Sequence, residues 1–174
     1  MREIEMQPEL EQPEQQSPPE QQSPMDQVLQ HVAAEVLETM FFTEAELADC
    51  EHTWLEAASS ARIGFEGSHF GEMLFGLSAE AVDPIAASFL GLDPAELTVA
   101  QRGQVIQELT NILCGAMVSH LWPESRLSIA SPELTSWQEW AAEGTLHRCF
   151  AIPEGRLAIS IRLLPRPHPP GNES

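Results

Sequence analysis

The chain has 174 residues, of which 43% are hydrophobic and 20% charged, a length and composition typical of one globular domain with a sizeable core. Its formal net charge is -19, and every basic residue in the sequence is an arginine. Phosphate backbones and anionic lipid surfaces repel such a chain, so neither nucleic acid nor membrane is expected as a partner.

The sequence has no signal-peptide pattern at its start and no run of eighteen apolar residues, so the cytoplasm is the expected location. Three cysteines, Cys50, Cys114 and Cys149, make an odd count without a disulfide-framework spacing. This count favours a reducing compartment.

Residues 1–23 are rich in Glu, Gln and Pro and poor in large apolar groups, so we predict a disordered acidic tail. The folded domain is predicted over residues 24–165, and residues 166–174 form a loose C-terminal tail.

A first helix is predicted at the start of this domain. Ser23 is a candidate helix cap, Pro24 suits the first helical position, and Asp26 lies in the first turn. Apolar residues then recur at helical spacing: Val28, Leu29, Val32, Val36, Leu37 and Met40.

A β-hairpin is predicted next, because Ile63 and Phe65 alternate with small or polar residues before Gly67–Gly71, and alternation resumes through Leu77. A helix follows with Ser78 as its candidate cap, and Pro84 must either kink that helix or mark a fresh start.

A longer helix of roughly 23 residues is bounded by Thr98 as a cap and Pro123 as a stop. Its predicted core face comprises Val105, Ile106, Leu109, Ile112, Leu113, Ala116 and Met117.

The remaining segments include a short strand in "RLSIAS" and a short helix opening at Ser131–Pro132 that carries Trp137 and Trp140. The chain then forms a second hairpin, in which "PEG" turns into the alternating strand "GRLAISIRL". This mixture predicts an α+β fold, a largely antiparallel β-sheet covered by helices.

Four residues of the long helix, Gln104, Glu108, Asn111 and Gly115, fall on the side opposite its apolar face. One interpretation is a plain solvated stripe. Asn and Gly nevertheless disfavour helix interiors, Gly by about 1 kcal/mol relative to Ala, and such a cost is tolerated where a site needs the residue.

The stretch "QELTNILCG" resembles the E-x-x-N motif, with its following glycine, of the CheX, CheC and FliY chemotaxis phosphatases. The order of "ARIGFEGSHFGEMLFGLS", "FLGLD", "DPAEL" and "GRLAISIRL" is also similar to that of CheX-like proteins over about residues 28–164. A second E-x-x-N occurs in some members, whereas "EVLETMFF" has Glu35 and Glu38 and no asparagine three positions after either, so one site per chain is expected.

The resemblance implies hydrolysis of the aspartyl phosphate of a CheY-like response regulator that carries its own Mg²⁺, so no cofactor of the chain's own is expected. Asn111 would orient the attacking water, and Glu108 would pair with a lysine near the phosphorylation site. Gly115 and Gln104 would shape the surface that binds the partner, and the family implies a homodimer. The alternative is a non-catalytic CheX-like module that binds a regulator or oligomerises.

Three other features of the sequence involve cysteine or histidine. The pairs "CEH" at 50–52 and "HRC" at 147–149 would offer a Cys₂His₂ zinc set if they met, although neither spacing is a standard zinc pattern. Cys114 is predicted to be a buried thiol without a catalytic base. His120 falls on the core side of the long helix and is predicted to be partly buried.

Overall fold

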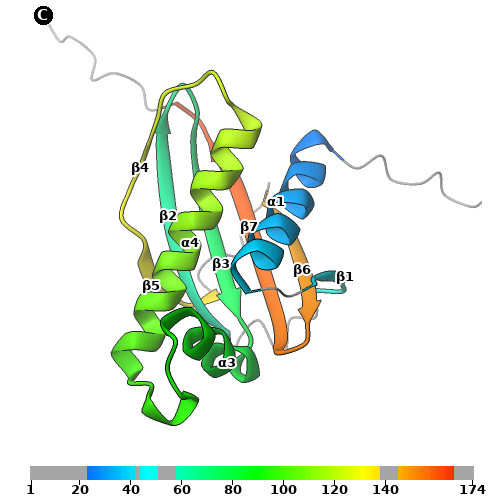
Figure 1. Ribbon diagram of the computed structural model, residues 1–174. Coiled ribbons are helices and arrows are strands. Elements are labelled where there is room, and N and C mark those ends of the chain that lie inside the picture. The colour runs from blue at the N-terminus through cyan, green and yellow to red at the C-terminus, as the bar shows by residue number, and fades with distance from the viewer. Residues whose placement is uncertain (1–22, 42–43, 51–57, 138–144, 167–174) are drawn as a thin grey trace, which may run out of the picture.

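The computed structural model describes residues 23–41, 44–50, 58–137 and 145–166 (Figure 1). The predicted disordered tail, apart from Ser23, lies outside these residues, as do Trp140 and the C-terminal tail beyond residue 166. The described helices are α1 (Pro24–Phe41), α3 (Ala79–Leu90), the 3₁₀ turn η1 (Pro94–Glu96) and α4 (Val99–Leu121). The described strands are β1 (Glu46–Ala48), β2 (Ser59–Gly67), β3 (Phe70–Leu77), β4 (Leu127–Ile129), β5 (Glu133–Thr135), β6 (Leu146–Ile152) and β7 (Gly155–Leu164).

The strands form one sheet in the order β1-β6-β7-β3-β2-β4, with β5 also paired to β2, and every pairing is antiparallel. Figure 1 shows α1 and α4 lying across one face of this sheet and α3 at one end of it. The two predicted hairpins are β2–β3 and β6–β7, and they meet where β3 pairs with β7. The predicted α+β fold is therefore confirmed.

Helix α1 starts as its sequence predicts. The backbone N–H of Asp26 donates to Ser23 Oγ at 3.1 Å. Asp26 is only 2% exposed, and its carboxylate pairs with Arg148 of β6, which compensates the cost of burying a charge. The start of α1 is thus fixed both by a local cap and by an ion pair to the sheet.

Helix α3 runs through Pro84 without a break, so the proline does not mark a fresh start. Ser78 takes the N-cap position, but its hydroxyl does not cap the helix. It accepts a hydrogen bond from the backbone N–H of Arg156 at 3.0 Å instead, which ties α3 to β7. Gly155 permits this approach, because a Cβ there would lie 2.8 Å from Ser78 Oγ.

Helix α4 has the predicted length of 23 residues. Thr98 and Gln101 form a capping box, in which the Gln101 N–H donates to Thr98 Oγ1 and the Thr98 N–H donates to Gln101 Oε1. The helix ends at Leu121, with Trp122 as its C-cap just before Pro123.

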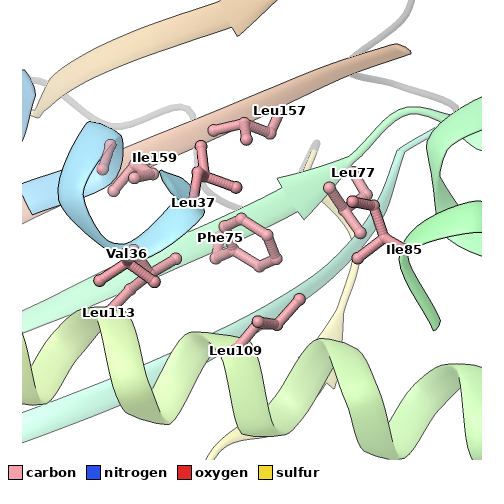
Figure 2. A pocket seen from close by; sticks show the side chains of 10 residues that line it. Val36, Leu37, Phe75, Leu77, Ile85, Leu109, Leu113, Leu157 and Ile159 are labelled. Carbon is pink, nitrogen blue, oxygen red and sulfur yellow. The ribbon is translucent and has the colours of Figure 1, made fainter. Parts of the chain in front are cut away.

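The core lies between the helices and the sheet. Figure 2 shows side chains from α1, α4, α3, β3 and β7 converging there, among them Leu37, Leu109, Ile85, Phe75 and Ile159. The void that they line is about 10 Å³ and apolar, at the lower limit of the room that one water molecule needs. This space is packed core and offers no room for a ligand.

The short helix predicted from Ser131–Pro132 is wrong over residues 133–135, which form strand β5. Long-range bonds to β2 explain the difference, because Ser60 Oγ donates to the Thr135 carbonyl at 2.8 Å. Arg62 also donates to Glu133 at 3.1 Å. Pairing with the free edge of β2 thus overrides the local helical pattern.

Cys50 and Cys149 form a disulfide, although they stand 99 positions apart in the sequence. The interpretation of the cysteines as unpaired residues of a reducing compartment is therefore wrong for this pair. The disulfide also removes the Cys₂His₂ zinc alternative, because bonded sulfurs are not thiolate ligands. His52, the other residue of that alternative on the Cys50 side, lies outside the described residues. Among the described helices, none is long and apolar enough to cross a membrane.

Candidate active site on helix α4

The two faces of α4 are separated as the sequence predicts. Val105, Ile106, Leu109, Leu113 and Met117 are at most 3% exposed and pack into the core. On the opposite side Gln104, Glu108 and Asn111 are exposed, and Gly115 is half-buried. We call Gln104, Glu108, Asn111 and Gly115 the polar stripe.

Glu108 is an exposed residue of the polar stripe. Among the residues that the structure describes, its carboxylate has no hydrogen bond or ion pair. Four of the arginines are engaged by other acids: Arg62 by Glu133, Arg102 by Asp83, Arg148 by Asp26, and Arg162 by Glu72. Glu108 therefore offers a negative charge to a basic group outside the chain.

Asn111 stands three residues after Glu108, so the two side chains are neighbours on one turn of the helix surface. Within the described ranges its amide also has no hydrogen-bond partner. An exposed amide offers both a carbonyl acceptor and two N–H donors, which is the set that a bound water molecule requires.

Gly115 closes the stripe one turn after Asn111. A Cβ placed on Gly115 would meet nothing within 4 Å, so the packing of the protein itself does not require glycine there. The missing side chain leaves the surface beside Asn111 clear.

The segment that includes β5 lies along one side of the polar stripe. This neighbour of the candidate site is not predicted from the sequence. Gln107 Nε2 donates to the Pro132 carbonyl at 2.8 Å. Leu134 lies over Gly103, where an added Cβ would be 2.9 Å from Leu134 Cδ1, and its side chain is 56% exposed. The exposed leucine places an apolar group beside the polar stripe. Its proximity to α4 depends on β5 pairing with β2, so no local signal predicts it.

Near the N-terminal end of α4, Arg102 forms a two-point ion pair with Asp83 of α3, with Nε–Oδ1 at 2.5 Å and Nη2–Oδ2 at 3.1 Å. The hydrogen bond from Arg102 lowers the pKa of Asp83. This pair joins α3 to α4 and occupies the arginine nearest to the stripe in the sequence.

The sequence also predicts the surroundings of two further residues of α4, Cys114 and His120. Cys114 is buried as expected, and burial raises the pKa of its thiol to about 12, so it is an unreactive packing residue. His120 was predicted to be partly buried, which is wrong, because its side chain is 41% exposed. It lies in the last turn of α4, beside His31 of α1, with the two ring centroids 5.6 Å apart.

A known family model matches the part of the chain that contains α4 and the central strands β2 and β3. The family model described as "Chemotaxis phosphatase CheX" matches residues 59–153, more than half of the chain. This span contains β2, β3, α3, α4 and the polar stripe. No curated protein matches the chain.

Solved structures share the fold over most of their length. A chemotaxis protein CheX from Vibrio vulnificus aligns with a TM-score of 0.67 and 19% identity, over 82% of this chain and 98% of that chain. CheX from Desulfovibrio desulfuricans aligns with a TM-score of 0.65 and 14% identity, over 80% and 99% of the two chains. A Borrelia burgdorferi structure described as a CheX–CheY–BeF₃–Mg²⁺ complex aligns with a TM-score of 0.59 and 16% identity, over 79% and 96%. At these identities the likeness shows the fold alone.

Proposed function

Since this chain belongs to the CheX chemotaxis phosphatase family, we propose that it hydrolyses the aspartyl phosphate of a CheY-like response regulator, with Glu108 and Asn111 as the working pair. The observation that carries the proposal is the exposed carboxylate and amide on neighbouring positions of α4, both without partners among the described residues. The structure of CheX in complex with CheY from another organism supports this class of partner.

The reaction requires little covalent chemistry from the protein. A water molecule attacks the phosphorus, and the bond from phosphorus to the aspartyl oxygen breaks. The regulator regains its carboxylate, and inorganic phosphate leaves as H₂PO₄⁻ with both hydrogens of the water. The Mg²⁺ belongs to the regulator and arrives with this substrate. What remains for the phosphatase is to place the water in line, and positioning of this kind contributes several kcal/mol to barrier lowering.

Asn111 is the residue that we assign to the water. Its carbonyl oxygen accepts a hydrogen bond from the water, while its N–H₂ donates to an oxygen of the phosphoryl group. An amide keeps this pattern at every pH because it does not titrate. A carboxylate in the same place would repel the phosphoryl oxygens.

We assign Glu108 the role of binding the response regulator. Its free carboxylate would pair with a lysine beside the phosphorylated aspartate, and this ion pair would fix how the two proteins are positioned against each other. Gln104 and Gly115 would form the surrounding contact surface, with Gly115 leaving room for the partner to approach Asn111.

The test is the rate at which phosphorylated CheY-like regulators from the same genome lose phosphate, with and without this protein. Asn111→Ala is expected to lower the acceleration about 100-fold while binding persists, because the water loses its orientation. Glu108→Ala is expected to weaken binding of the regulator about tenfold.

Glu38→Ala serves as the matched acidic control, since Glu38 is exposed on α1 and lies outside the stripe. It should leave both quantities unchanged. If the regulator binds but loses phosphate no faster with the wild-type protein, the catalytic proposal fails and a docking module stands in its place. Full activity in Asn111→Ala would also reject the assigned role.

A further inference from the structure

A second group of polar side chains lies between α1 and the last turn of α4. His31 and Glu35 are one helical turn apart on α1, and His120 reaches them from α4. One ligand atom from each of the three residues lies within 4.8 Å of the other two, and all three side chains are exposed. The polar stripe and the proposed phosphatase reaction make no use of this cluster.

The spacing in the cluster fits metal ligands better than hydrogen bonds. The Nε2 atoms of His31 and His120 lie 3.8 and 3.7 Å from the same oxygen, Glu35 Oε2. Both separations exceed a hydrogen bond, for which about 2.7–3.2 Å is usual. Ligand atoms at Zn–N and Zn–O distances of about 2.0–2.2 Å stand roughly 3.3–3.5 Å apart in a tetrahedron. Closing the cluster around one ion takes a contraction of a few tenths of an ångström along these two edges, together with an approach of the two imidazoles, whose ligand atoms lie within 4.8 Å of each other. Side-chain rotation can supply both movements at an exposed site.

The hydrogen bonding of His120 also prepares it as a ligand. Its Nδ1 lies 3.0 Å from the Ala116 carbonyl oxygen. A carbonyl only accepts, so Nδ1 carries the hydrogen in this contact, and Nε2 of the neutral ring presents its lone pair towards Glu35. A backbone carbonyl that fixes the tautomer in this way is the usual support of a metal-binding histidine.

We propose that His31, Glu35 and His120 form a Zn²⁺ site with three protein ligands, which joins α1 to the end of α4 and leaves one coordination position open to solvent. Two imidazoles and one carboxylate are a donor set that Zn²⁺ binds well, whereas Mg²⁺ and Ca²⁺ prefer oxygen ligands. The net charge of -19 adds a favourable field for a cation. The site departs from the expectation that the chain has no metal of its own.

The proposed metal site is separate from the polar stripe. His120 comes nine residues after Asn111, which places it half a rotation around α4 and about 13 Å further along the axis. The proposal therefore does not rest on the phosphatase function. Asn111→Ala should bind Zn²⁺ as tightly as the wild type.

The test is a calorimetric titration of the full-length, untagged, disulfide-bonded protein with ZnCl₂. We expect one Zn²⁺ per chain, with binding reversed by EDTA. His31→Ala and His120→Ala should each weaken binding at least tenfold, and Glu35→Gln should weaken it too, because each loses one of three ligands. MgCl₂ in place of ZnCl₂ should give no binding at the same site.

The matched controls are His69→Ala and Glu38→Gln, which remove a half-buried histidine that stacks on Trp122 and an exposed acid, both outside the cluster. Both should bind Zn²⁺ like the wild type. A Zn²⁺-dependent rise in Tm that is lost in His120→Ala would support a link between α1 and α4. The absence of Zn²⁺ binding up to about 100 µM metal, or binding unchanged in both histidine variants, would overturn the proposal.

Discussion

The two faces of α4 differ in what their side chains contact. On the core face, Leu109 is 2% exposed and belongs to the cluster that α1, α3 and the sheet complete. On the polar stripe, Glu108 and Asn111 have no partner among the described residues. One capped helix holds both faces in place. Stability and function are therefore expected to separate by position around the helix, and substitutions can test that separation.

The largest expected effect on stability comes from the core face. Leu109→Ala should lower the free energy of unfolding by about 2–5 kcal/mol, because it removes a buried side chain and leaves a cavity against Phe75 and Ile85. Denaturant unfolding measures the loss. Below its lowered Tm, the variant should keep the dephosphorylation activity that we propose for the chain.

Glu108→Ala is the comparison on the opposite face, and its unfolding free energy should stay within about 0.5 kcal/mol of the wild type. A stability loss of several kcal/mol in Glu108→Ala would show that the stripe is structural after all. The division between the two faces would then be wrong.

The buried thiol of Cys114, on the buried side of α4, should make the free energy of unfolding depend on pH. Burial raises the pKa of the Cys114 thiol from 9.0 to about 12, so the folded protein keeps a proton that the unfolded chain releases above pH 9. Stability should therefore fall as pH rises from about 9 towards 12, by roughly 1.4 kcal/mol per pH unit. Unfolding at pH 8 and pH 10 under non-reducing conditions measures it.

The composition isolates this effect. The sequence contains no tyrosine and no lysine, and Cys50 and Cys149 are joined, so Cys114 is the side chain expected to lose its proton between pH 9 and 11 in the unfolded chain while keeping it in the folded protein. Cys114→Ala should abolish the slope between pH 8 and pH 10. If the slope survives in that variant, the buried thiol does not cause it.

The sequence predicts α4 well because its signals are local. Thr98 and Gln101 cap the helix and Pro123 stops it, and its apolar spacing separates the buried face from the stripe. The two hairpins can be predicted equally well, because the alternation of apolar and polar residues and the turn residues between the strands all lie within short stretches of sequence. The family resemblance then adds the roles of Glu108 and Asn111, which stay predictions.

The features that sequence reasoning missed depend on contacts between distant segments. Strand β5 forms because the edge of β2 pairs with it, and the disulfide joins cysteines separated by 99 positions. His31 and Glu35 have a readable helical spacing, but the arrival of His120 depends on how α4 packs against α1. Local sequence patterns carry no information about contacts between segments that lie far apart in the chain.

A small stabilising effect is expected at Gly115, and it distinguishes a role in folding from a role in partner binding within the polar stripe. Gly115→Ala should raise the free energy of unfolding by about 0.5–1 kcal/mol, because alanine favours the helix and its Cβ meets nothing within 4 Å. Gly103→Ala is the matched control on the same helix, and its gain should be smaller because its Cβ would press on Leu134 at 2.9 Å. If Gly115→Ala is stabilised and binds the phosphorylated regulator more weakly, the missing side chain serves the partner. If the substitution destabilises the protein, glycine serves the fold, and Gly115 leaves the predicted contact surface.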